Sequence, residues 1–180
     1  MTESGSLVRS FVASDGYPLH VRIWPAEAEP HGRVVVLHGV QSHGGWYHGL
    51  GRSLAAAGYT VSFPDRRGSG ANAIDRGHTP TARRLNLDLA EWLRAVRGEE
   101  PRLPVALAGI SWGGKLAMIA AARYPKLVDA VALICPGDRK GDITNRGHNE
   151  YCGVEKGTGV ETGSRYVCLI YESDAWTESA

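Results

Sequence analysis

Short apolar runs alternate along this chain with longer segments whose apolar residues recur at helical spacing. The apolar runs are typical of strands buried on both faces and cover residues 33–37, 59–63, 104–108 and 130–134. Helical patterns between them cover residues 51–57, 85–96 and 115–122. Because strands alternate with helices, the pattern predicts a mostly parallel sheet with right-handed crossovers and helices on both faces.

Both ends of the chain depart from this alternation. Residues 7–13 and 18–24 alternate like strands on either side of Ser14-Asp15-Gly16, which predicts an antiparallel hairpin. After Pro136 the chain is rich in glycine and charge and shows neither period as far as Ser164, so we expect a loop there. One further buried strand is predicted over residues 166–171. The predicted organisation is an α/β domain over residues 1–136 and a divergent tail over residues 137–180.

The composition is that of one globular domain, with 180 residues of which 43% are hydrophobic. The formal net charge of +1 gives no electrostatic footprint for nucleic acid or for an anionic membrane surface. The N-terminus lacks the pattern of a signal peptide, and no apolar run is long enough to span a membrane, so we expect a cytoplasmic protein. Cys135, Cys152 and Cys168 support neither a disulfide framework nor a zinc site.

The stretch Gly109-Ile110-Ser111-Trp112-Gly113 stands between an apolar run and a helical pattern. That context places Ser111 at a strand-to-helix turn, at the carboxyl end of a strand, where ligands bind in parallel sheets. The flanking glycines let strand and helix approach closely, and such a turn holds its serine in a strained conformation. The pattern is typical of the exposed nucleophile of an acyl-transfer enzyme.

A second loop, Leu37-His38-Gly39-Val40, follows the apolar run that ends at Leu37. An oxyanion hole in this architecture needs two backbone amides, because the carbonyl oxygen of the substrate becomes negatively charged. One amide comes from the residue after the nucleophile, here Trp112, and the other from this loop, where Val40 is the best assignment. The two loops together therefore predict an oxyanion hole.

Three histidines lie in or near the second loop. His38, beside Gly39, is interpreted as ordering the loop through hydrogen bonds rather than as a catalytic base. His43 and His48 follow on the rim of the expected pocket, where we expect solvated or substrate-facing side chains.

Three motifs follow one another in the order His38-Gly39, Pro64-Asp65-Arg66-Arg67-Gly68-Ser69-Gly70 and Gly109-Ile110-Ser111-Trp112-Gly113-Gly114. Together they resemble the α/β-hydrolase superfamily and, within it, the monoacylglycerol lipase and lysophospholipase-like group, also called the serine aminopeptidase S33 type. The resemblance covers about residues 7–136. It implies an α/β-hydrolase fold, with Ser111 as the nucleophile and with Val40 and Trp112 as the oxyanion hole. It also implies that Asp65 and Arg67 shape their loop and take no part in the catalytic triad.

The acid of a triad follows a later strand in this fold. Leu169-Ile170-Tyr171-Glu172-Ser173-Asp174 resembles that strand and turn, which makes Asp174 the candidate acid. Tyr171 departs from the family there, because it stands where the family usually has glycine. An aspartate on the surface near the terminus is an equally good description of Asp174. Asp138, just after the run at 130–134, is a second candidate.

The catalytic base has no clear candidate. In this fold the order along the chain is serine, acid, histidine, yet no histidine follows Asp174. His148 is the single histidine after Ser111, and its place before Asp174 breaks the expected order. We therefore interpret the chain as the front part of a hydrolase, truncated before its cap region, last strand and catalytic histidine.

The leading hypothesis for function is a serine hydrolase of carboxylic esters that forms an acyl-serine intermediate at Ser111. The resemblance implies lipophilic acyl esters, such as monoacylglycerols, as the small-molecule substrates. The serine mechanism requires no metal and no organic cofactor, so we expect none. The alternative is a catalytically incompetent truncated fragment or a non-enzymatic binding module, whose exposed apolar sheet edge would favour self-association.

Overall fold

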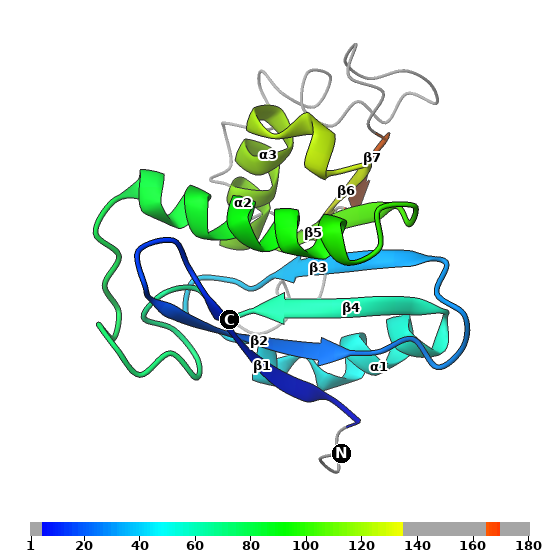
Figure 1. Ribbon diagram of the computed structural model, residues 1–180, viewed down its shortest axis with the longest axis horizontal. Coiled ribbons are helices and arrows are strands. Elements are labelled where there is room, and N and C mark those ends of the chain that lie inside the picture. Colours follow the sequence, from blue (N-terminus) through cyan, green and yellow to red (C-terminus); the bar gives the residue numbers. More distant parts are fainter. Residues whose placement is uncertain (1–4, 135–164, 170–180) are drawn as a thin grey trace, which may run out of the picture.

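One mixed sheet of seven strands runs through the molecule (Figure 1). The structure, a computed structural model, describes residues 5–134 and the backbone of residues 165–169. The strands are β1 (Leu7–Val12), β2 (Pro18–Trp24), β3 (Gly32–Leu37), β4 (Tyr59–Pro64), β5 (Val105–Ile110), β6 (Ala130–Ile134) and β7 (Arg165–Leu169). Their order across the sheet is β1-β2-β4-β3-β5-β6-β7. The pairs β1–β2 and β2–β4 are antiparallel, and all other neighbours are parallel.

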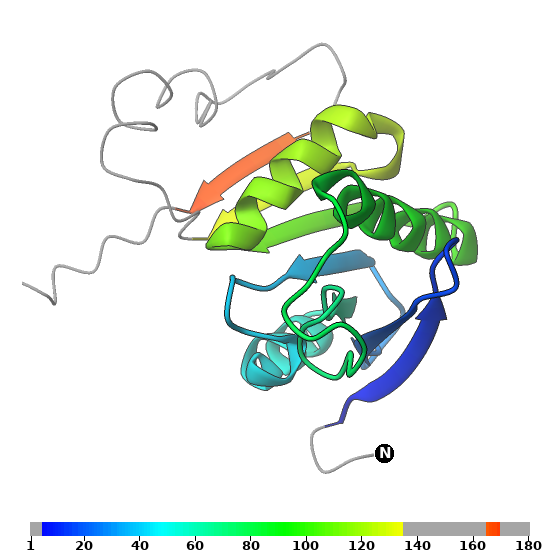
Figure 2. The same cartoon turned by 90° about the vertical axis from the view of Figure 1, so that its left-hand side faces the viewer.

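Helices cover both faces of this sheet. α1 (His48–Ala56) lies on one face, whereas α2 (Ala82–Glu99) and α3 (Trp112–Arg123) lie on the other, as Figure 2 shows from the side. The short 3-10 helix η1 (Gly44–Trp46) precedes α1, and η2 (Pro125–Leu127) follows α3. The mostly parallel sheet with helices on both faces, predicted from the alternating pattern, is confirmed.

Each face of the sheet has its own apolar core. Under α2 and α3, Trp92 and Leu93 are buried against Leu107 of β5. Under α1, the buried side chains include Trp24 and Phe63. Burying one large apolar side chain contributes roughly 1.5–3 kcal/mol, so both faces stabilise the sheet substantially.

The hairpin predicted at the N-terminus is also confirmed, because β1 and β2 pair antiparallel with Leu7 opposite Ile23. Gly58 follows the end of α1 with φ of 86°, a left-handed conformation that favours glycine, as its place after the helical pattern predicts. The start of α1 at His48 lies before the predicted start at residue 51. The helix is longer because Leu50 and the preceding Tyr47 add apolar contacts to the core under α1.

The two edges of the sheet are β1 and β7. β7 pairs parallel with β6, Ala130 opposite Arg165, in the region where the sequence predicts a strand over 166–171. At the other edge, Leu7, Val8 and Val12 are exposed on β1. The division of the chain at residue 136 stays a prediction.

Candidate active site

Ser111 occupies the turn between β5 and α3 in a strained backbone conformation. Its φ is 53° and its ψ is −122°, which for a residue other than glycine costs about 1–3 kcal/mol. Its own amide donates to the carbonyl oxygen of Ile134 at 2.9 Å, which fixes the turn to β6. The strand-to-helix turn and the strain predicted from the sequence are both confirmed.

Glycines beside Ser111 are required by close approach of the backbone. A Cβ on Gly109 would lie 2.5 Å from the Cα of Gly114, and a Cβ on Gly113 would lie 2.4 Å from the carbonyl oxygen of Leu37. Both distances are far below van der Waals contact, so neither position accepts a side chain. The start of α3 is thereby held directly against β5 and the end of β3.

The loop after β3 lies beside Ser111. A Cβ built on Gly39 would stand 3.5 Å from the Cβ of Ser111, which is ordinary van der Waals distance. The next residue, Val40, lines an open pocket of about 330 Å³ together with Trp112 at the start of α3. The structure therefore brings the two residues assigned to the oxyanion hole to the wall of one pocket; Ser111, which directly precedes Trp112, is not itself a lining residue.

The remaining walls of this pocket come from the long loop after β4 and from the start of α2. Arg66, Ser69 and Thr79 belong to the loop, and Leu85 belongs to the helix. The walls thus combine apolar surface with hydroxyl groups and the two guanidinium groups of Arg66 and Arg67, a mixture that suits a ligand with both apolar and polar parts.

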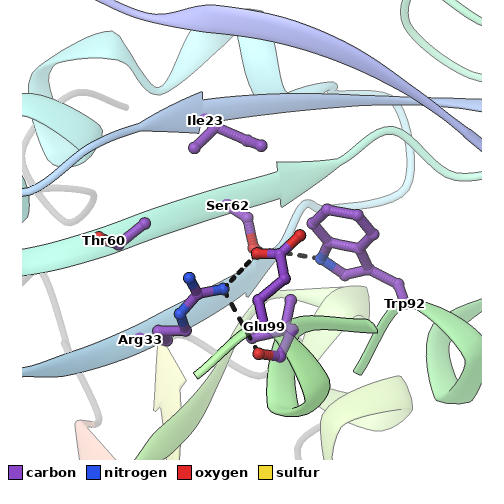
Figure 3. Close-up of a pocket in the computed structure, with 7 residues that line it drawn as sticks. Ile23, Arg33, Thr60, Ser62, Trp92 and Glu99 are labelled. Carbon is purple, nitrogen blue, oxygen red and sulfur yellow. Dashed lines mark hydrogen bonds and ion pairs between the residues drawn. The ribbon is translucent and has the colours of Figure 1, made fainter. Parts of the chain in front are cut away.

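A second cavity lies between the sheet and α2 (Figure 3). Its volume is only about 30 Å³, close to that of one water molecule. The guanidinium of Arg33 reaches the Glu99 carboxylate at 2.6 Å, and the indole of Trp92 donates to the hydroxyl of Ser62 at 3.1 Å. This cavity is too small for an ester substrate.

His38 is fully buried and uses both ring nitrogens in the loop. The backbone amide of Arg66 donates to Nε2 at 3.1 Å, so Nε2 is unprotonated and Nδ1 carries the proton that it donates to the Gly39 carbonyl oxygen at 2.8 Å. Burial, followed by the positive charge of Arg66, lowers the pKa of His38 to about 4. A neutral imidazole with both nitrogens occupied cannot accept the Ser111 proton, and the interpretation of His38 as a loop-ordering residue is confirmed.

His43 and His48 each pack against an aromatic ring. The side chain of His43 accepts a hydrogen bond from the Gly45 amide at 3.1 Å and caps η1, while its ring lies 5.5 Å from that of Trp46. The ring of His48 packs edge-on against Trp24 with centroids 5.6 Å apart. Neither residue lines the pocket, and both side chains are partly exposed and pack against aromatic rings, so the expectation that they face solvent or substrate stays a prediction.

Asp65 and Arg67 anchor the loop after β4. The Asp65 carboxylate accepts from the amides of Gly44 at 2.7 Å and Ala71 at 2.9 Å, which ties this loop to the one after β3. The Arg67 guanidinium binds Asp88 of α2 through two hydrogen bonds of 3.0 and 2.9 Å, and these bonds raise its pKa. The structural role that the resemblance implied for Asp65 and Arg67 is confirmed.

Arg66, between them, is a site residue that the sequence does not single out. Its guanidinium donates to three consecutive carbonyl oxygens, those of His38, Gly39 and Val40, with Nη2 distances of 2.7 Å to Gly39 and 3.0 Å to Val40. Its Cζ also lies 4.7 Å from the centre of the Trp112 ring, within cation–π range. Burial lowers the pKa of Arg66 to about 10, so the group stays charged at neutral pH.

The other predicted site residues lie outside the described part of the chain. These are Asp138, His148 and Asp174. Within residues 5–134, no cluster of three or more histidine, cysteine or carboxylate side chains is placed to hold a metal ion. The described helices include none with the length and apolar character needed to cross a membrane.

The sheet order and the strained serine before α3 define an α/β-hydrolase fold, and solved structures agree. A thermostable carboxyl esterase from Bacillus coagulans matches with a TM-score of 0.64 at 24% identity, over 72% of this chain and 44% of the esterase. A soluble variant of monoglyceride lipase from Saccharomyces cerevisiae matches with a TM-score of 0.64 at 21% identity, over 71% of this chain and 43% of the lipase. Similarity at this level of identity shows the fold.

The family model for serine aminopeptidase, S33, matches residues 28–144, and the chain belongs to this family. A monoacylglycerol lipase of Mycolicibacterium smegmatis is 30% identical over 136 residues, which are 76% of this chain and 49% of the lipase. Human monoglyceride lipase is 30% identical over 125 residues, which are 69% of this chain and 41% of that protein. The chain therefore spans about half the length, or less, of these curated relatives.

Proposed function

We propose that this chain carries the nucleophile of a serine ester hydrolase that acts on lipophilic acyl esters such as monoacylglycerols. The observation that carries the proposal is the strained backbone of Ser111, held beside Gly39 and at the start of α3. Strain of this kind persists where surrounding structure enforces it, and it is typical of functional sites. Membership of the S33 family and the lipase names of the relatives support the substrate class.

The first chemical step forms a bond between Ser111 Oγ and the ester carbonyl carbon, while a base takes the hydroxyl proton. The carbonyl electron pair moves to oxygen and gives a tetrahedral oxyanion. When the carbonyl reforms, the bond to the alcohol oxygen breaks, and the alcohol leaves with a proton from the protonated base. Water then attacks the acyl-serine by the same route and releases the carboxylic acid.

The amides of Val40 and Trp112 are proposed to stabilise the oxyanion. Trp112 is the first residue of α3, so its N–H has no partner within the helix. Among residues 5–134, no acceptor pairs with the Val40 N–H. Two such amides, from residues that line one pocket and of which Trp112 directly follows Ser111, are what the developing negative charge requires.

The acid and the base belong to the same proposal. We propose Asp174 as the acid, on the family resemblance of its strand and turn. None of the histidines within residues 5–134 lines the pocket formed by Val40 and Trp112, and His38 is occupied at both nitrogens. The mechanism therefore requires a base from outside that range, and a His148→Ala variant tests whether His148 supplies it.

The second candidate function is a non-enzymatic binding module on the same fold. It is favoured by the absence of a histidine from the lining of the pocket within residues 5–134. A serine hydrolase without its base retains only the acceleration from binding and the oxyanion hole, which in serine proteases is on the order of 10³–10⁴ over water. A cytoplasmic location and self-association through a sheet edge also stay predictions.

Reaction of the full chain with a fluorophosphonate, together with release of fatty acid from a monoacylglycerol, tests the proposal. We expect labelling and turnover that disappear in Ser111→Ala. Ser53→Ala is the matched control, because Ser53 is an exposed serine of α1 that does not line the pocket. A chain that unfolds cooperatively yet shows no Ser111-dependent labelling would exclude the enzyme and leave the binding module.

A further inference from the structure

The Arg66 guanidinium donates hydrogen bonds to the backbone of the loop after β3. The carbonyl oxygens of His38, Gly39 and Val40 are consecutive along the chain, and all three accept from it. The Gly39 oxygen is the most heavily engaged, since it also accepts from His38 Nδ1 at 2.8 Å and from Ser42 Oγ at 3.3 Å. The orientation of this one peptide group is thus fixed from several directions.

The orientation of the Gly39 carbonyl decides where the Val40 N–H points. The bond between the two residues is trans, because the described chain contains no cis peptide, and in a trans peptide the N–H points opposite to the C=O. With the oxygen directed at Arg66, the Val40 N–H is directed away from Arg66. Turning this peptide over would remove the hydrogen bonds to a half-buried cation and place an N–H against it.

The charge of Arg66 is also unusual among its neighbours. Within the described residues, no carboxylate lies at ion-pair distance from Arg66, whereas Arg67 reaches Asp88 at 2.9 Å and Asp15 at 2.9 Å. Arg66 therefore lies on the wall of the pocket, over the ring of Trp112, with no carboxylate bound directly to its positive charge. A fixed positive charge there favours negative charge developing nearby.

We infer that Arg66 is a positioning residue that holds the Gly39–Val40 peptide so that the Val40 N–H serves as an oxyanion donor beside Ser111. The inference rests on the proposed function of Ser111. It adds a group that touches both parts of the oxyanion hole, the Val40 loop through hydrogen bonds and Trp112 through its ring. An arginine suits this task because its planar fork presents several donors in a fixed geometry, whereas the three donors of a lysine ammonium all leave one nitrogen atom.

The test uses the full chain with Arg66→Gln, with Arg66→Lys, and with Arg52→Gln as a matched control on the exposed face of α1. The rate of fluorophosphonate labelling of Ser111 is measured well below the melting temperature of each variant, so that all molecules are folded. We expect Arg66→Gln to slow labelling by about 10²–10³-fold, the loss seen when one oxyanion donor is removed. We expect a smaller loss in Arg66→Lys and none in Arg52→Gln.

Nuclear magnetic resonance of the same proteins reports the orientation of the Gly39–Val40 peptide group independently of any reaction at Ser111. The carbonyl carbon shift of Gly39 and the amide nitrogen shift of Val40 should change in Arg66→Gln and stay unchanged in Arg52→Gln. Labelling of Arg66→Gln at the wild-type rate overturns the inference; if that variant does not fold, wild-type labelling of folded Arg66→Lys overturns it instead. If wild-type protein is never labelled, the proposed function fails, and the shifts alone decide whether Arg66 positions the peptide.

Discussion

Arg66 and Arg67 are adjacent in the loop after β4, but they hold different parts of the molecule. Arg67 turns toward carboxylates, binding Asp88 of α2 and Asp15 in the turn between β1 and β2. Arg66 turns the other way and binds backbone carbonyls of the loop after β3. The ion pairs of Arg67 fix where the loop lies, whereas the hydrogen bonds of Arg66 fix how peptide groups beside Ser111 are turned.

The difference between the two arginines shows how one loop can join scaffold to site. Hydrogen bonds to Asp88 raise the pKa of Arg67, while burial away from a direct carboxylate partner lowers the pKa of Arg66 to about 10. A cation with paired carboxylates contributes mainly to folding. A cation that binds neutral carbonyls keeps its field available to the pocket.

The largest effect is expected on the Arg67 side. Arg67→Ala removes two hydrogen bonds from the buried Asp88 carboxylate, which keeps its bond to Arg84 at 2.8 Å, and it also removes the ion pair with Asp15. Breaking a buried pair costs about 3–5 kcal/mol when a charge is left unpaired, and because Arg84 remains we expect a loss at the lower end, about 3 kcal/mol. Urea unfolding followed by circular dichroism measures the loss. Arg102→Ala, at an exposed turn, is the control and should stay within about 0.5 kcal/mol of wild type. Equal effects of the two substitutions would show that the Arg67 pairs do not anchor the loop.

The next largest effect is a dependence of stability on pH that comes from His38, which accepts a hydrogen bond from the Arg66 amide. His38 has a pKa of about 4 in the folded chain against about 6.5 when unfolded, so the unfolded state binds more protons between these values. The free energy of unfolding should therefore be fully retained above pH 6.5 and fall as pH drops toward 4, by about 3 kcal/mol from this group.

His38→Asn isolates that contribution, because it removes the titrating ring from the same buried position. Unfolding free energies of wild type and variant are compared at several pH values across this window. The difference between the two should shrink as pH falls, since only wild type loses the His38 term. A difference that is constant with pH would contradict the buried, neutral imidazole.

The smallest effect on stability concerns Asp65, whose carboxylate joins the loop after β3 to the loop after β4. Gly70 has φ of 56°, and a Cβ there would lie 2.1 Å from the Asp65 carboxylate, which two backbone amides hold in place. Gly77 has φ of 75° but open space around it. Both alanine substitutions place a side chain on a left-handed backbone, so this cost is common to the two. Gly70→Ala should therefore lower the free energy of unfolding by about 1–3 kcal/mol more than Gly77→Ala does, the cost of overpacking. Thermal unfolding that ranks them equally would remove Asp65 from this role.

Much of the scaffold could be predicted because it depends on local pattern. The alternating apolar runs located β3 to β6, and the glycine after α1 marked its end, since both follow from periodicity and from the left-handed conformation that glycine accepts. The turn at Ser111 could also be predicted, because strand and helix approach so closely there that only glycine fits at the flanking positions.

The arrangement around Arg66 could not be predicted in the same way. Its partners are backbone oxygens of His38, Gly39 and Val40, and backbone oxygens leave no mark in the sequence. The surroundings of the histidines in that loop were also hard to predict. The sequence placed His43 and His48 on the pocket rim by their position after the motif, whereas the structure packs their rings against Trp46 and Trp24, and neither residue lines the pocket.

The central claim is that Ser111 is a nucleophile, and one peptide tests it directly. Trypsin is expected to release residues 103–115, between Arg102 and the cut after Lys115, and Ser111 is the one hydroxyl-bearing residue in that peptide. After treatment of the folded chain with a fluorophosphonate, mass spectrometry should find the added phosphonyl group on this peptide. A folded chain whose peptide keeps its unmodified mass at saturating probe would contradict the account.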